Sequence, residues 1–183
     1  PDIQYHIAHA SFANPARRIF DRFPGLTIGP CPLRPHSRGY VHICSSDPFA
    51  PPSIRFNYLS ADKDKEVLVR GMEIARDIMR APAMKRLVVA EERPGSIMES
   101  KEELLAFARQ TGNTVYHPAC SCRMGPDPKT GDVVDSRLRV HGLRGVRIAD
   151  ASIMPIITSG NTHAPTVMIA EKAADMIKTG LAG

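Results

Sequence analysis

The chain has 183 residues, of which 43% are hydrophobic and 23% are charged, and its formal net charge is +5. These proportions are typical of a globular protein and exclude a disordered, collagen-like or coiled-coil chain. The positive excess is small and scattered along the sequence, so no nucleic-acid partner is expected.

The first 36 residues are rich in proline and show little periodicity. Pro30 and Pro32 alternate within residues 26–33, and a central strand could not carry both because proline has no amide hydrogen. We therefore predict an edge strand or an extended connector there. Residues 39–44 and 54–58 are two short strand candidates, which predict an antiparallel pair joined by a proline-bearing connection.

Three helices are predicted further along the chain. The first begins at Ser60-Ala61-Asp62 and ends near Arg80, before Ala81-Pro82. Apolar or small residues share one of its faces at helical spacing: Val67, Gly71, Ile74, Ala75 and Ile78. The second begins with a capping box at Ser100 and ends near Gly112-Asn113, where a left-handed stop is expected.

The third predicted helix runs from Pro165 to about Lys178, with the proline in its first turn. Its polar residues form one narrow stripe: Glu171, Lys172, Asp175 and Lys178. A stripe this narrow predicts a largely buried helix. Before it, residues 135–140 and 146–149 are predicted as strands joined by a turn over residues 141–145.

Four cysteines, at positions 31, 44, 120 and 122, are too few for a disulfide scaffold. Cys120 and Cys122 lie closer together than a zinc knuckle requires, and no second Cys/His pair stands at finger spacing. We expect no metal site, and mostly buried, reduced thiols that serve packing. Arg123 in the same loop fits either a buried ion pair or a surface charge.

Signals for secretion or membrane insertion are not evident. No apolar run approaches the roughly 18 residues that span a bilayer, and the first residues do not resemble a signal peptide. We expect no membrane span and a cytoplasmic location. The first residue is Pro1, not Met, so the chain is expected to be a piece of a longer protein.

Two of the seven histidines stand in unusual surroundings. His117 precedes a loop rich in Cys, Met and Gly, and His163 follows Gly160-Asn161-Thr162 just ahead of the third helix. Backbone amides at a helix N-terminus can face an anion or a carbonyl group. Composition alone still favours structural roles for both, as it does for His42 and His141.

Long motifs in this sequence resemble the C-terminal signature of the glucose–methanol–choline (GMC) flavin oxidoreductases. They agree in order and spacing and occupy residues 34–39, 57–59, 117–125, 134–135, 138–142, 146–155 and 160–172. The resemblance covers roughly residues 30–180. The Gly-x-Gly-x-x-Gly turn for the dinucleotide pyrophosphate is absent from this sequence. The chain therefore resembles only the C-terminal third of such an enzyme, and its partner would be the missing N-terminal FAD-binding portion.

The resemblance implies an α+β fold, with an antiparallel-sheet substrate domain and the C-terminal segment of an α/β FAD-binding domain. Residues 1–113 would belong to the first and residues 114–183 to the second. It also implies oxidation of a small alcohol by hydride transfer to N5 of FAD. The isolated fragment is expected to be inactive. The rival hypothesis is a non-catalytic binding or interaction module without flavin.

Site residues carry over from the matching motifs. The catalytic base of the family matches His117, and the second active-site position, His or Asn in the family, matches His163. Cofactor-facing positions match Asp150, Ala151, Ser152, His163, Ala164, Pro165 and Thr166. Choline-type members tend to have Asn at position 163, and this chain has no Trp and few aromatic residues for an ammonium cage, which disfavours choline.

Overall fold

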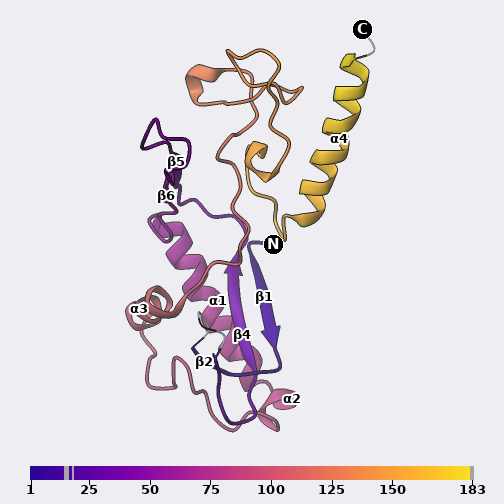
Figure 1. The fold of residues 1–183 in the computed structure, drawn as a ribbon. Coiled ribbons are helices and arrows are strands. Elements are labelled where there is room, and N and C mark those ends of the chain that lie inside the picture. The colour runs from indigo at the N-terminus through magenta and orange to yellow at the C-terminus, as the bar shows by residue number, and fades with distance from the viewer. Residues whose placement is uncertain (15–16, 18, 182–183) are drawn as a thin grey trace. The chain divides into compact units, whose positions relative to one another are not determined.

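The computed structural model of the chain describes residues 1–14, 17 and 19–181 (Figure 1). It divides into two compact units. The first comprises Pro1–Arg38 and Asn57–Val115, and the second comprises Gly39–Phe56 and the chain from Tyr116 onward. The last two residues of the predicted 114–183 segment lie outside the described residues. Helices and small antiparallel strand pairs make up the described chain, which confirms the α+β class.

In the first unit, β1 (Ile3–Ala8) pairs antiparallel with β4 (Thr27–Pro32). The amide of Leu33 donates to the carbonyl of Asp2 at 2.8 Å, so that pair exchanges ladder hydrogen bonds. Bonded and non-bonded pairs alternate along an antiparallel ladder, so Pro30 and Pro32 fall where the backbone nitrogen faces away from β1. The predicted edge strand is confirmed. A smaller pair joins β2 (Phe12–Asn14) to β3 (Ile19–Phe20).

Helix α1 (Asp62–Arg80) packs on β4. At Gly71 an added Cβ would lie 2.8 Å from both Ile3 Cδ1 and Pro30 Cβ, so only glycine permits this close approach. The Tyr5 hydroxyl donates to the Gly71 carbonyl at 2.9 Å. Ile78 is 40% exposed, although it shares its predicted helix face with Gly71 and Ala75, which are buried. Helical spacing determines toward which side of the helix a side chain points, but burial also requires another element that packs against that side.

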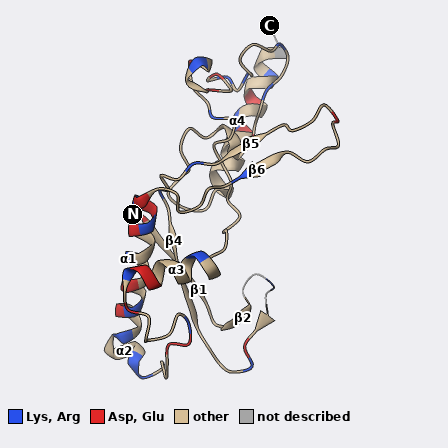
Figure 2. Cartoon of the chain, turned by 90° about the vertical axis from the view of Figure 1, so that its left-hand side faces the viewer, with Lys and Arg blue, Asp and Glu red and all other residues tan. Residues whose placement is uncertain are grey.

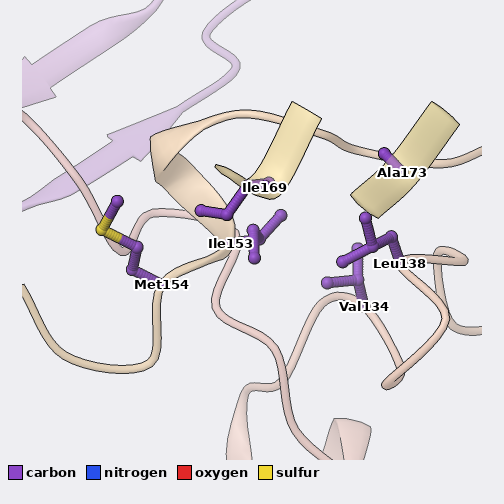
Figure 3. Close-up of a cluster of buried hydrophobic side chains, with 6 residues drawn as sticks. All are labelled: Val134, Leu138, Ile153, Met154, Ile169 and Ala173. Carbon is purple, nitrogen blue, oxygen red and sulfur yellow. The ribbon is translucent and has the colours of Figure 1, made fainter. Parts of the chain in front are cut away.

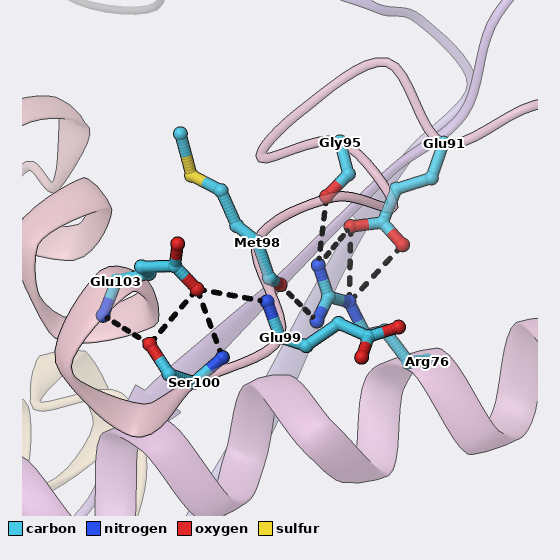
Figure 4. Close-up of polar contacts among 7 residues, drawn as sticks. All are labelled: Arg76, Glu91, Gly95, Met98, Glu99, Ser100 and Glu103. Atoms are coloured by element: carbon cyan, nitrogen blue, oxygen red, sulfur yellow. Dashed lines mark hydrogen bonds and ion pairs between the residues drawn. The ribbon is translucent and has the colours of Figure 1, made fainter.

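Arg76 on α1 holds the loop that leads to the helix beginning at Lys101 (Figure 4). Its guanidinium binds both carboxylate oxygens of Glu91, the shortest N···O distance being 2.7 Å. It also donates to the carbonyls of Gly95 and Met98, at 3.1 and 2.7 Å. The arginine side chain is 12% exposed, so these bonds are partly shielded from water. Figure 2 shows other acidic and basic residues alternating along α1.

The short helix α2 (Pro82–Lys85) follows α1, and α3 (Lys101–Thr111) begins at the predicted capping box. The Glu103 amide donates to Ser100 Oγ at 3.2 Å, and the Ser100 amide donates to Glu103 Oε2 at 3.0 Å (Figure 4). The predicted left-handed stop is wrong: Gly112 has φ −60° and ψ 148° and leaves the helix in extended conformation.

In the second unit, β5 (Tyr40–His42) pairs antiparallel with β6 (Ser53–Arg55), so both strands are shorter than predicted. Strands over residues 135–140 and 146–149 were predicted wrongly, because only isolated bridges form, at Val134–Val140 and Arg139–Arg147. Leu138 has φ 64°, a left-handed conformation that interrupts the first extended run. The turn over residues 141–145 is present, with two glycines at positive φ.

The core of the second unit gathers around α4 (His163–Leu181), which begins two residues before the predicted Pro165. The buried side chains in Figure 3 are Val134, Leu138, Ile153, Met154, Ile169 and Ala173. Other apolar residues of α4 remain exposed, among them Val167 at 47% and Met168 at 59%. The predicted largely buried helix is therefore wrong for the described chain, because packing covers one side of α4. No helix in the described ranges is long and apolar enough to cross a membrane.

Candidate functional site

Both ring nitrogens of His117 are hydrogen bonded to the residues immediately before α4. The Nδ1 atom lies 2.9 Å from Thr162 Oγ1, and the Nε2 atom lies 3.0 Å from Asn161 Nδ2. His117 is half-buried and Thr162 is 6% exposed. Two sequence motifs 45 residues apart thus meet at one imidazole ring.

The backbone on either side of His117 is strained. Tyr116 has φ 60° and Cys120 has φ 72°, left-handed conformations that side chains other than glycine and asparagine rarely adopt. Such residues cost roughly 1–3 kcal/mol each and concentrate at functional sites.

The loop after His117 runs beside the segment predicted to face the cofactor. The amide of Cys120 donates to the Ala151 carbonyl at 3.3 Å, and the amide of Cys122 donates to the Ser152 carbonyl at 2.9 Å. Residues 151–153 form the single turn η2 (Ala151–Ile153). Asp150 caps this turn, since its Oδ1 accepts the Ser152 amide at 2.7 Å. The Asp150 carboxylate thus accepts a backbone amide of its own turn.

The remaining predicted residues form the first turn of α4. His163 and Ala164 are exposed, while Pro165 and Thr166 are half-buried. The Thr166 amide and hydroxyl both donate to the Thr162 carbonyl, at 3.0 and 2.7 Å. Within the described part of the chain no hydrogen bond joins His117 to His163. The two histidines are connected through Asn161 and Thr162, which contact the His117 ring and immediately precede His163.

Sequence reasoning missed three residues that the structure singles out. Asn161 and Thr162 contact His117 directly, and, as a separate feature, Thr158 Oγ1 is buried with no hydrogen-bond partner in the described chain. A buried polar atom without a partner calls for a ligand or water. Asn and Thr directly ahead of a predicted helix N-terminus were the signal that could have singled out two of them.

The loop that follows His117 is held by a partly exposed ion pair. Arg123 Nε donates to Asp132 Oδ1 at 2.8 Å, so Arg123 is an ion-pair partner as in the first alternative, but its side chain is 42% exposed and the pair is not buried. The amide of Asp127 holds the pKa of the Asp132 carboxyl below its usual value, against the opposing effect of burial, and Arg123 and Thr130 add to this. His141 Nε2 lies 2.9 Å from the carbonyl of Gly125, a structural contact.

The cysteines depart in part from expectation. All four are free thiols, but Cys44 is exposed and Cys31, Cys120 and Cys122 are half-buried, so the prediction of mostly buried thiols is wrong. Burial raises the pKa of the Cys31 thiol. Cys120 packs against the core around α4. Among the described residues no cluster of three His, Cys, Asp or Glu side chains could hold a metal ion.

Comparison with curated proteins gives relatives that are longer than this chain. An oxygen-dependent choline dehydrogenase of Pseudomonas syringae pv. tomato is 44% identical over 179 residues, which cover 97% of this chain and 31% of that protein. An alcohol dehydrogenase (acceptor) of Pseudomonas putida is 42% identical over 177 residues, or 97% of this chain and 32% of that protein. The chain therefore spans about a third of the length of these relatives.

Solved structures give the same picture of the fold. Pyridoxine 4-oxidase from Mesorbium loti superposes with a TM-score of 0.84 at 31% identity, covering 96% of this chain and 34% of that one. A fungal aryl-alcohol oxidase superposes with a TM-score of 0.77 at 31% identity, covering 86% of this chain and 26% of that one. A family model described as GMC oxidoreductase matches residues 35–170. The chain belongs to the GMC oxidoreductase family, as a C-terminal fragment of that fold.

Proposed function

We propose that this chain is the C-terminal part of an FAD-dependent alcohol oxidoreductase in which His117 is the catalytic base. The observation that carries the proposal is the pair of hydrogen bonds that fix the His117 imidazole against Asn161 and Thr162, at 3.0 and 2.9 Å. An ordered imidazole at the junction of two functional motifs is what proton abstraction from a bound hydroxyl requires, because a general base must be held within hydrogen-bond reach of its proton.

Two features of the second unit fit a flavin cofactor. Thr158 offers a buried hydroxyl with no partner in the described chain, and the first turn of α4 presents backbone amides that helical bonding leaves unused. Negative charge on a ligand near this turn would be stabilised by about 0.3–1 kcal/mol through the helix dipole. The FAD-facing residues would be Asp150, Ala151, Ser152, His163, Ala164, Pro165 and Thr166. The assignment of residues 1–113 and 114–183 to substrate and FAD domains belongs to the same proposal.

When bound, FAD supplies the acceptor, at its N5, for the hydride that leaves the alcohol carbon. The chain's own part is to manage the proton and the charge. His117 takes the hydroxyl proton, since a neutral imidazole is a competent base near neutral pH. His163, exposed at the start of α4, donates a hydrogen bond to the substrate oxygen as alkoxide character grows.

The proposed substrate is a small primary alcohol. Relatives are named for choline, for alcohols and for aryl alcohols. A cationic headgroup is disfavoured by this chain, which has no Trp, 5% aromatic residues and a histidine at position 163. A neutral alcohol such as an aryl alcohol is therefore our first choice.

The test is anaerobic stopped-flow reduction of the flavin in the full-length protein by benzyl alcohol, pyridoxine and choline. In His117→Ala, with FAD content verified, reduction should slow about 10²- to 10⁴-fold, the usual worth of positioned proton transfer. The matched control is His42→Ala, because His42 is an exposed histidine of β5 outside the site. Normal reduction in fully loaded His117→Ala would remove this histidine from the mechanism. A full-length protein that binds no flavin would favour the non-catalytic module.

A further inference from the structure

We propose that Thr162 is a positioning residue, which selects the neutral tautomer of His117 that carries its hydrogen on Nδ1 and leaves Nε2 as the proton acceptor. This inference rests on the proposed function, since it assigns the atom with which His117 acts. It concerns Thr162 and Asn161, neither of which belongs to the set of residues predicted from the motifs. Their contacts with the ring, with the Asn161 amide nitrogen toward Nε2, favour the tautomer that carries its hydrogen on Nδ1.

The contact with Asn161 determines the state of Nε2. The neighbouring atom is the amide nitrogen Nδ2, at 3.0 Å. An amide NH₂ group has two hydrogens to donate and no lone pair to accept with, so the ring nitrogen must accept. A neutral imidazole carries one hydrogen, and that hydrogen is consequently on Nδ1.

The contact with Thr162 gives the Nδ1 hydrogen its acceptor. Thr162 Oγ1 lies 2.9 Å from Nδ1, and a hydroxyl oxygen has lone pairs that can accept. The side chain is 6% exposed, so water has little access with which to replace it. Thr162 is itself fixed, because its carbonyl accepts both the amide and the hydroxyl of Thr166 at the start of α4.

This arrangement has a consequence for catalysis. The Nε2 lone pair is occupied by the amide of Asn161, an exposed side chain, so a substrate hydroxyl would reach Nε2 by displacing that amide. Without the Thr162 hydroxyl, an Nδ1 hydrogen would lose its protein acceptor, and the ring would place the hydrogen on Nε2 once the exposed Asn161 side chain turns its amide oxygen toward that atom. A ring with its hydrogen on Nε2 has no lone pair at the acceptor position and could not act there as a base.

The decisive readout is the tautomer itself. Full-length protein labelled with ¹⁵N-histidine, with and without FAD, is measured by long-range ¹H–¹⁵N correlation, and the His117 signals are assigned by their loss in His117→Gln. The expected spectrum has a protonated Nδ1 and an unprotonated Nε2. A wild-type spectrum with the hydrogen on Nε2 would overturn the inference, whatever the behaviour of any variant.

The variants separate this inference from the proposed function. Thr162→Val keeps the shape and loses the hydroxyl, so the Nε2-protonated tautomer should appear and flavin reduction should slow about 3- to 10-fold. Thr162→Ser should restore both the spectrum and the rate. Thr179→Val is the control, since Thr179 Oγ1 bonds the Asp175 carbonyl within the last turns of α4. An unchanged tautomer in Thr162→Val, together with a slow His117→Ala enzyme, refutes the role of Thr162 alone. Normal turnover in His117→Ala refutes the proposed function instead.

Discussion

Asp64, in the first turn of α1, accepts a hydrogen bond of 2.8 Å from the backbone amide of Ser37, which lies 27 positions earlier in the chain. Its other carboxylate oxygen accepts the amide of His36 at 2.7 Å. The residue is 4% exposed. A buried carboxylate thus fixes the loop that precedes β5 to the start of the longest helix in the first unit.

Replacing this carboxylate should destabilise the fold. Asp64→Asn leaves one oxygen for two amides and places an NH₂ group against a backbone N–H, so we expect a loss of about 1–3 kcal/mol in the free energy of unfolding. Urea denaturation at neutral pH measures it. Asp62→Asn is the control in the same helical turn, because Asp62 is exposed and bonds only Lys65. An equal loss in both variants would contradict a special role for Asp64.

The Asp64 carboxylate should also make the free energy of unfolding depend on pH in the acid range. Burial alone would raise the pKa of Asp64, but the amides of His36 and Ser37 and the Ser37 hydroxyl hold it below its usual value. The unfolded chain therefore binds the proton more readily, and the stabilisation is complete above the unfolded pKa of about 4 and lost as pH falls through the lower folded pKa. Unfolding free energies of wild type and Asp64→Asn should converge in that acid range. A constant difference at every pH would count against this account.

Arg76→Lys should weaken the first unit although it keeps the charge. A lysine cannot reproduce the forked contacts to Glu91 or reach the carbonyls of Gly95 and Met98 at the same time. We expect a loss of about 1–3 kcal/mol by urea denaturation, as for charge-assisted hydrogen bonds. Arg70→Lys is the matched control on the same helix, since the Arg70–Glu73 pair is exposed. Similar stabilities of the two variants would disprove the argument.

His163 should act by donating a hydrogen bond and not as a base. In the full-length protein, His163→Ala should slow flavin reduction about 10²- to 10³-fold, the usual cost of losing one oxyanion donor. His163→Asn should be milder, because asparagine keeps an N–H donor. Anaerobic stopped-flow measurements at verified FAD occupancy compare the two. Equally slow flavin reduction in His163→Ala and His163→Asn would show that the hydrogen-bond donor at position 163 does not set the rate.

The isolated chain should bind FAD weakly or not at all and should not oxidise alcohols. Its sequence has no Gly-x-Gly-x-x-Gly turn, whose amides bind the pyrophosphate. Titration of flavin fluorescence measures the affinity, with the full-length protein as the positive control. Tight, stoichiometric binding by residues 1–183 alone would refute this expectation.

Cys120 and Cys122 should be dispensable for cofactor and metal content. Both are half-buried thiols outside any disulfide. The double change to Ser or Ala should cost at most a few kcal/mol in the free energy of unfolding, as usual for partly buried side chains, and should leave FAD content unchanged. Elemental analysis should find no zinc. One zinc per chain that disappears in the double variant would reverse this interpretation of the loop.

Local sequence signals predicted the long helices well, because each of these signals depends only on residues a few positions apart. The capping box at Ser100 needs only residues three positions apart, and α1 begins where its acidic first turn indicates. What failed depends on distant partners. The burial of α4 depends on which parts of the protein pack around it. The strands predicted near Leu138 are reduced to isolated bridges by the left-handed conformation of Leu138, which the sequence pattern did not indicate.

The candidate site divides in the same way. Sequence motifs indicated His117 and His163, but they could not show that Thr162 and Asn161 contact the His117 ring. That contact joins segments far apart along the chain, and a short polar residue before a helix is more often a simple cap. Long-range geometry was therefore needed to find it.

The two outward-facing prolines of β4 determine at which edge of its sheet a further strand can be added. An incoming strand needs hydrogens to accept along the edge it joins, and Pro30 and Pro32 remove two of them on the side of β4 that faces away from β1. Any further strand, whether from elsewhere in the same protein or from a second copy, would extend the sheet more readily at β1. Edge-to-edge aggregation through β4 is correspondingly blocked, and Pro32→Ala and Pro30→Ala would reopen that edge.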